Sequence, residues 1–409
     1  MKKLLLLLLF FFVTAFIHAQ TYVQNESVQI LWQGQYYPGK ILSVKGDQYL
    51  ISYDGYDASW NETVGKDRLK KTNGESTSNG QEQTNVATTT TTSTVAEMPN
   101  AFYSSVETIW DEELNKDGKL LVCASAYGNI KILNEGDLTL VQQIEVGKDP
   151  LNCVSISDDG MFIAAGGKNI SVYKRNASGT YDSYATLGDY YEVSKMRFIP
   201  GTHQVVAGAS PAAAYTKTIV DVWNVDDQKI SMNLCPATYA NYICAIAVSA
   251  DGKKIALAFS KIPEGIDVYD AATGKLSYHV NSKRDISACA FSPDGNFIVG
   301  GGIEQKVFMW NTSTHALVWS AVWTTDAEQY IYGVAFSPDG KTVAACGHGS
   351  ENAVKSYSAA NGKLNKGLGK DNPGGNAITY NKEGTSVLVA YTTYGDIAKV
   401  TVVEKLSVQ

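Results

Sequence analysis

Residues 20–72 alternate short apolar and polar positions between turn signals. The runs read VQILWQG, YYPGKILSV and QYLISYD, with Gly and Asp turn residues such as GD at 46–47 and DG at 54–55. Alternation with a period of two is typical of strands that bury one face. This segment is therefore predicted to form a small antiparallel β-barrel of about five strands.

From residue 99 to residue 409 the apolar runs recur with a long period. Two clear copies begin CAFSPDGNFIVGGG and VAFSPDGKTVAACG, and each copy has a glycine at the same turn. The turn glycines are Gly118, Gly160, Gly201, Gly252, Gly295, Gly340 and Gly384, spaced 42, 41, 51, 43, 45 and 44 residues apart. Several short strands in a unit of 40 to 45 residues are typical of a β-propeller blade, so seven blades are predicted. NAFYSS at 100–105 is predicted to complete the last blade.

Two further segments have no strand pattern. Residues 73–98, rich in Thr and Ser, contain too few apolar residues for a core and are predicted to form a disordered linker. At the start of the chain, Lys2 and Lys3 precede an apolar run at 4–17 and a small residue, Ala19. This pattern predicts a signal peptide over residues 1–19. The protein is thus expected to be exported, periplasmic or extracellular, and not membrane-spanning after cleavage.

Residues 99–409 resemble the WD40 family. The FSPDG ending of the first strand is intact at 291–295 and 336–340, and VWN at 222–224 and MWN at 309–311 stand where the family has Trp-Asp. The family's Gly-His pair is missing. The resemblance implies an all-β, seven-bladed WD40-like β-propeller that acts as a platform for protein partners.

Residues 20–72 resemble the Tudor and chromo-barrel family, which has an SH3-like fold. The matching stretches are YPGKIL, YLISYDGY and SWNETV. In that family an aromatic cage surrounds a methylammonium group through cation–π contacts. The resemblance implies a cage of Tyr37, Tyr53, Tyr56 and Trp60. Three interpretations stay open: barrel packing, a site for a methylated or quaternary amine, and binding of a peptide or an envelope polymer.

Composition and charge exclude several classes of function. The formal charge is −7, and loss of Lys2 and Lys3 takes it to −9, which does not suit a nucleic-acid partner. The six cysteines have no C-x-x-C spacing, so structural zinc is not predicted. Most of them lie in apolar strand runs and are expected to be buried thiols, with one disulfide as the alternative. The Asp-Gly pairs are predicted to be hairpin turns and not calcium ligands.

No catalytic motif is present. His203, His279, His315 and His348 lie in different repeats without metal-ligand spacing, and His348 in CGHGSE is the one in a loop. The prediction is therefore a non-enzyme without catalytic residues, metal or cofactor. The alternatives are a propeller hydrolase or lyase, which requires acidic and histidine side chains at the channel mouth, and a module that binds envelope polymer.

Tyrosines gather in the predicted loops between blades. The candidate residues for a protein-interaction face are Tyr190, Tyr191, Tyr215, Tyr239, Trp323 and Tyr330. Tyr242 and Tyr332 either join them or pack between blades. Rigid amphipathic rings are frequent at binding hot spots. The sequence therefore predicts an exported scaffold whose propeller binds protein partners and whose barrel supplies a second contact.

Overall fold

The computed structural model describes residues 22–23, 26–32, 35–45, 48–53, 62–71, 102–105, 108–211, 218–235, 242–259, 264–324, 330–348, 352–370, 374–393 and 400–408. The chain divides into two compact units, Met1–Thr94 and Val95–Gln409, and each has its own hydrophobic core. The expected signal peptide at 1–19 and the expected linker at 73–98 lie outside the described residues.

The N-terminal unit is a five-stranded antiparallel sheet with the order β4-β3-β2-β1-β5. Its elements are β1 (Ser27–Trp32), β2 (Gln35–Lys45), β3 (Gln48–Tyr53), β4 (Glu62–Gly65), η2 (Lys66–Arg68) and β5 (Leu69–Lys71). Alternate residues such as Val28 and Ile30 on β1 and Tyr49 and Ile51 on β3 form the core. The period of two in the sequence therefore corresponds to one buried face, and the number of strands agrees with the prediction.

The second unit consists of four-stranded antiparallel sheets, seven of them among the described residues. The first three are β7 (Ile109–Leu114), β8 (Leu120–Ser125), β9 (Asn129–Asn134) and β10 (Leu140–Glu145); β11 (Cys153–Ile156), β12 (Phe162–Gly166), β13 (Ile170–Arg175) and β14 (Tyr181–Leu187); and β15 (Tyr190–Phe198), β16 (Gln204–Pro211), β17 (Ile219–Asn224) and β18 (Lys229–Cys235). These sheets are called blades 1 to 3.

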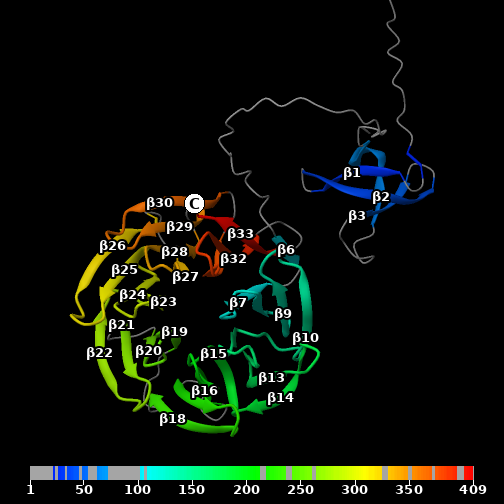
Figure 1. Ribbon diagram of the computed structural model, residues 1–409. Coiled ribbons are helices and arrows are strands. Elements are labelled where there is room, and N and C mark those ends of the chain that lie inside the picture. The colour runs from blue at the N-terminus through cyan, green and yellow to red at the C-terminus, as the bar shows by residue number, and fades with distance from the viewer. Residues whose placement is uncertain are drawn as a thin grey trace, which may run out of the picture. The chain divides into compact units, whose positions relative to one another are not determined.

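Blades 4 to 7 follow in chain order. They are β19 (Ile243–Val248), β20 (Lys254–Phe259), β21 (Gly265–Asp270) and β22 (Leu276–Asn281); β23 (Ile286–Phe291), β24 (Phe297–Gly302), β25 (Lys306–Asn311) and β26 (Leu317–Val322); β27 (Ile331–Phe336), β28 (Thr342–Gly347), β29 (Asn352–Ser358) and β30 (Leu364–Lys370); and β31 (Gly375–Tyr380), β32 (Ser386–Thr393), β33 (Val400–Ser407) and β6 (Phe102–Ser105). The blades form a ring with the first strand of each blade at the centre (Figure 1).

The ring is closed by a strand from its own beginning. β6 pairs antiparallel with β33, with Phe102 opposite Glu404 and Ser105 opposite Thr401. The prediction that residues 100–105 complete the last blade is confirmed. Closure of this kind pairs an edge that an open array of sheets would leave exposed.

The Asp-Gly pairs form the turns between the first and second strands. In blade 5 the Ser292 hydroxyl donates to Asp294 Oδ1, which accepts from the Asn296 backbone N–H at 3.0 Å. Gly295 has a φ of +69°, a value that favours glycine. Equivalent serine–aspartate contacts occur at Ser157, Ser249 and Ser337. The carboxylates thus serve as turn acceptors, and the hairpin-turn prediction is confirmed.

Aliphatic and aromatic side chains from successive blades pack into shared clusters. One cluster joins Phe162 and Val172 of blade 2 to Met196 and Val205 of blade 3. Cys123, Cys153 and Cys346 are buried thiols, as expected from their apolar surroundings, and burial raises the pKa of Cys153 to about 12. No disulfide joins the cysteines whose side chains are described.

Candidate binding face and channel

The topology places equivalent residues of all blades on the same face of the ring. The first strands of the blades all run in the same direction. Each of them pairs antiparallel with the second strand of its blade, so the first residue of the first strand lies beside the last residue of the second strand. We call this side, which carries the loops between blades, the loop face. The opposite side, with the Asp-Gly turns, is the turn face.

The exposed aromatic side chains of the described propeller lie on the loop face. We call them the aromatic rim: Trp110 and Tyr127 of blade 1, Tyr191 of blade 3, Tyr242 before blade 4 and Tyr332 of blade 6, which are 41–62% exposed. The large exposed aliphatic residues of the propeller lie elsewhere, on the fourth strands, as Leu276 on β22 and Leu317 on β26 do. The exposed amphipathic rings of the described propeller therefore lie on one face of the ring of blades.

The residues predicted for this face differ in exposure. Tyr191 is on the aromatic rim, and the half-buried Tyr330 packs at 6.1 Å from the ring of Tyr332. Tyr190 is buried; its hydroxyl donates to Asp221 at 2.8 Å and accepts from the Trp223 indole at 2.8 Å. Trp323 is fully buried, and its indole N–H donates to the His348 carbonyl at 3.1 Å. Tyr215 and Tyr239 lie outside the described residues.

Sequence reasoning missed Trp110 and Tyr127. Trp110 lies eight residues before the turn glycine Gly118, just as Tyr332 lies eight residues before Gly340. In blades 1, 4, 5, 6 and 7 that spacing marks the second residue of the innermost strand, and applying it to every repeat would have found Trp110.

A cavity of about 500 Å³ opens at the centre of the loop face. Its lining includes Asn152, Glu192, Lys195 and His348 together with part of the aromatic rim. A narrower cavity of about 80 Å³ continues into the channel. We call the six residues that line both cavities the throat: Trp110, Lys195, Cys244, Ser287, Tyr332 and Asn376. The throat receives one side chain from each blade except blade 2.

Below the throat, an ion pair connects three blades. Arg197 of blade 3 donates from Nη1 to Asp111 Oδ2 at 2.8 Å and from Nη2 to Asp111 Oδ1 at 2.9 Å. The same Asp111 accepts from the Val154 N–H of blade 2 at 3.1 Å. The Asp111 carboxylate raises the pKa of Arg197 against the opposing effect of burial. Both carboxylate oxygens of Asp111 thus accept hydrogen bonds, and this bidentate pair holds blades 1, 2 and 3 together.

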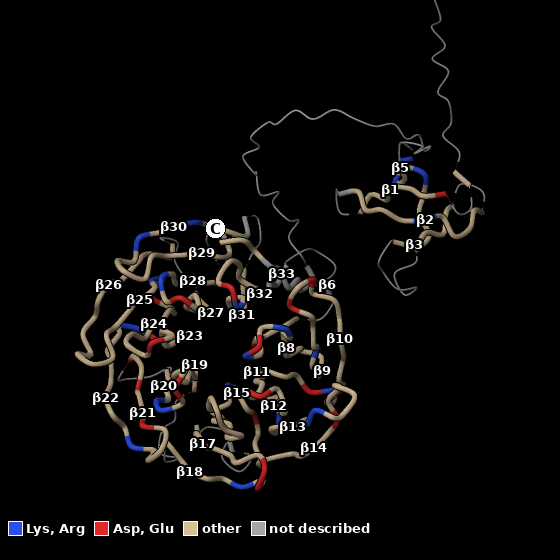
Figure 2. The backbone as a smooth tube through the Cα atoms, viewed as in Figure 1, with Lys and Arg blue, Asp and Glu red and all other residues tan. Residues whose placement is uncertain are grey.

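Two glutamates follow Asp111 on β7, so this innermost strand carries three consecutive acids (Figure 2). Glu112 is buried, and neither of its carboxylate oxygens has a hydrogen-bond partner. Burial, together with the charge of Asp111, raises its pKa to about 8. Burial also raises the pKa of Glu113 to about 7, although Arg197 opposes this shift. Both groups therefore carry less than a full charge near neutral pH.

An acidic residue and a histidine, which catalysis would require, both line the mouth of the channel but come from different blades. Glu192 comes from blade 3 and His348 from blade 6. The Glu192 carboxylate accepts from the Asn152 side-chain amide at 3.1 Å. Burial lowers the pKa of His348, so it is uncharged at neutral pH. Glu192 and His348 thus belong to blades that are three apart in chain order.

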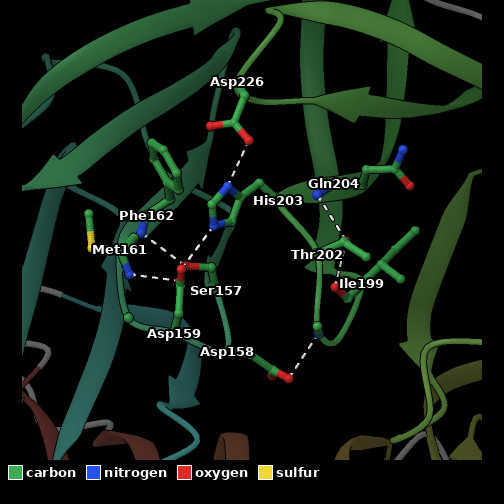
Figure 3. A network of polar contacts seen from close by, with 12 residues as sticks. Ser157, Asp158, Asp159, Met161, Phe162, Ile199, Thr202, His203, Gln204 and Asp226 are labelled. Atoms are coloured by element: carbon green, nitrogen blue, oxygen red, sulfur yellow. Dashed lines mark hydrogen bonds and ion pairs between the residues drawn. The ribbon is translucent and has the colours of Figure 1, made fainter.

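A second polar cluster lies on the turn face (Figure 3). His203 Nδ1 is 2.7 Å from Asp226 of blade 3, and its Nε2 is 2.9 Å from Asp159 in the turn of blade 2. With a carboxylate at each nitrogen, both nitrogens act as donors when the ring is charged. The two aspartates raise the pKa of His203 against the opposing effect of partial burial. The cluster is a connection between two blades.

Replacing His203 by Asn should lower stability in a pH-dependent way. Because the pKa of His203 is raised in the folded state, its contribution is fully present below about pH 6.5 and is lost as the pH rises through the folded-state pKa. The side chain is 31% exposed, so we expect a difference of about 1 kcal/mol or less, roughly 1–3 °C in Tm. Thermal unfolding of both proteins at pH 6 and pH 9.5 measures it. An equal difference at both pH values would contradict the charged connection.

In the N-terminal unit, two of the four cage candidates are described, and they are neighbours. The rings of Tyr37 and Tyr53 meet edge to face with their centroids 6.3 Å apart. Tyr53 is buried, and its hydroxyl accepts from Arg68 Nη2 at 3.1 Å, whereas Tyr37 is half-buried. Tyr56 and Trp60 lie outside the described residues. The described pair is thus an edge-to-face aromatic contact, and the cage of four rings stays a prediction.

Comparison with known proteins agrees with the geometry of the ring. Residues 272–311 and 318–356 match the family model "WD domain, G-beta repeat". The chain is also similar to the WD repeat-containing protein WDS homolog of Arabidopsis thaliana, with 22% identity over 208 residues. That match covers 50% of this chain and 38% of the relative. Within the part of the chain that the structure describes, no helix has the length and apolar character to cross a membrane. Two stretches of the second unit therefore match WD repeats, and the unit has the fold of a seven-bladed WD40-like β-propeller.

Proposed function

We propose that this protein is an exported, non-catalytic scaffold that binds protein partners on the loop face of its propeller. The observation that carries the proposal is the aromatic rim, because five exposed rings of the described propeller share the loop face, and two of them, Trp110 and Tyr332, line its central cavity, while the exposed aliphatic residues are spread over the outer strands. Large rigid rings bury much surface at little entropic cost and are enriched at hot spots. The apolar run at 4–17 behind two lysines supports export.

The N-terminal sheet would supply a second contact. Its Tyr37–Tyr53 pair supports a small aromatic site for an amine, a peptide or an envelope polymer. Joining two binding modules in one chain raises the effective concentration of the second contact once the first has formed. The barrel would thus strengthen an interaction that the propeller specifies.

Substituting two rim tyrosines should remove partner binding. We expect Tyr191→Ser combined with Tyr242→Ser to reduce retention of partners by about 10-fold or more, because each exposed ring acts as an anchor. Envelope proteins captured by the chain without residues 1–19 would be identified and quantified by mass spectrometry. The matched control is Leu276→Ser with Leu317→Ser, which removes two side chains of similar exposure from the outer strands.

Loss of the same captured proteins in the control would show that the outer strands, and not the loop face, mediate docking. A third variant without residues 20–98 tests the N-terminal unit. Capture that is weaker but keeps its dependence on Tyr191 and Tyr242 is the expected result. Capture that vanishes in this variant and persists in the tyrosine variant would overturn the proposal.

A further inference from the structure

The throat differs chemically from the aromatic rim above it. Lys195 is the only charged residue among the six that line both cavities, and its neighbours there are two aromatic rings, a thiol, a hydroxyl and an amide. Lys195 is half-buried. A cation therefore lies where the two cavities meet, in the path of a side chain that enters from the loop face.

Lys195 has no counter-ion among the residues that the structure describes. Its ammonium takes part in none of the ion pairs between them. A half-buried ammonium without a paired carboxylate is incompletely stabilised, and an anionic ligand would complete its coordination.

Of the acidic residues that line the cavities, Asp111 is paired with a cation and Glu112 carries reduced charge, whereas Glu192 lies at the mouth, outside the throat. Asp111 is neutralised by Arg197 in the bidentate pair, and Glu192 accepts from the Asn152 amide. Glu112 and Glu113 have raised pKa values, about 8 and about 7. Lys195 is thus the charge at the throat that remains for a ligand.

We propose that the throat binds the carboxylate side chain of an acidic peptide segment of the docking partner, with Lys195 as its counter-ion. The Ser287 hydroxyl supplies a further donor, and Trp110 and Tyr332 flank the methylene stem of the inserted residue. This inference rests on the proposed docking function and adds the chemistry of the partner.

The dimensions of the channel and its charge support a single inserted side chain. The cavity beyond the throat is about 80 Å³, which accommodates the end of a side chain but not a folded element. The formal charge of −7 opposes a polyanion at long range, but at physiological salt this repulsion is screened beyond about 8 Å. A close contact between one carboxylate and Lys195 is not screened in this way.

Cys244 provides a direct probe, because it lines the throat and is accessible enough to react. Iodoacetate and iodoacetamide alkylate the thiolate in the same way: sulfur displaces iodide from the methylene carbon, a C–S bond forms, and the thiol proton goes to buffer. The two reagents differ in the carboxylate. The ratio of their rates at Cys244, mapped by peptide mass spectrometry in the chain without residues 1–19, therefore reports the preference for a carboxylate independently of thiol reactivity.

We expect the iodoacetate-to-iodoacetamide ratio at Cys244 to exceed that of free cysteine by about 10-fold, as for a charge-assisted contact. Lys195→Met should remove the excess, whereas Lys195→Arg should retain it. The matched control is Lys148→Met, which removes an exposed lysine from a loop of the same face and changes the net charge equally. A ratio that equals that of free cysteine, or that is unchanged in Lys195→Met, would overturn the proposal.

A second measurement identifies the occupant. A capped pentapeptide of glycine and serine with a central glutamate should protect Cys244 from iodoacetamide more strongly than the same peptide with glutamine. Inorganic phosphate serves as the comparison anion. A carboxylate preference without peptide protection, or protection by phosphate alone, would show a small-anion site and overturn the acidic-peptide proposal. Partner capture that depends on Tyr191 and Tyr242 but not on Lys195 would overturn this inference and leave the docking face intact.

Discussion

A propeller that lacks β6 should unfold at a temperature lower by roughly 5 °C or more than one that contains it. Four residue pairs join β6 to β33, from Phe102–Glu404 to Ser105–Thr401. At about 1 kcal/mol for each hydrogen bond, removing this strand costs about 2–4 kcal/mol. It also leaves β33 as an unpaired edge, which is a template for association with other chains. Calorimetry and light scattering on a chain that begins at residue 106 measure both effects.

A chain that begins at residue 99 is the matched control. It lacks the whole N-terminal unit but keeps β6, and the two units have separate cores. Its propeller should unfold at the same temperature as in the longer protein and remain monodisperse. If the two truncated chains unfold at the same temperature, ring closure by β6 contributes nothing measurable to stability, and the role we assign to the strand is wrong.

Replacing Glu112 by Leu should stabilise the propeller, and the gain should grow with pH. In the folded protein the pKa of Glu112 is raised to about 8, while the unfolded chain releases this proton near pH 4.5. The unfolded state therefore binds fewer protons between these values, so wild-type stability falls as the pH rises through this window. The expected loss is about 3–5 kcal/mol by pH 8. Denaturant unfolding at pH 4.5, 6 and 8 measures it.

A leucine at position 112 would resemble the aliphatic residues that most other blades have at the equivalent position. Six residues before the turn glycine, where blade 1 has Glu112, four of the other six blades have an aliphatic residue, namely Val154, Ile246, Val334 and Ile378, while blade 3 has Lys195 and blade 5 has Cys289. The same change at an exposed position, Glu145→Leu, is the control and should leave the pH dependence unchanged. Parallel pH profiles of the wild type and Glu112→Leu would mean that Glu112 is ionised or solvated in the folded state.

Much of the propeller is predictable because each blade is a local unit. A turn glycine, which follows an aspartate in five of the seven repeats, marks the hairpin between the first two strands, and the recurrence of this glycine fixes the number of blades. The same register identifies the residues at the channel mouth, since Asn152, Ser287, Tyr332 and Asn376 each stand eight positions before a turn glycine. Even the closing strand follows from counting strands, because the seventh repeat is one strand short.

The exposure of individual rings is not predictable in this way. Tyr190 and Tyr191 are neighbours in the sequence, yet one is buried against Asp221 and Trp223 while the other is exposed. Successive residues of a strand point to opposite sides, and packing decides which side is buried. Trp323, in a tyrosine-rich loop sequence, fills the interior beside His348 for the same reason.

By itself, the sequence determined the all-β class, the seven-fold repeat and the turn chemistry. These features depend on contacts within one repeat or on its period. Only the tertiary structure decided that Arg197 pairs with Asp111, that Glu112 is buried without a partner and that Lys195 lies in the throat. These features join residues of different blades, 86 positions apart for Arg197 and Asp111, and they arise only when the ring closes.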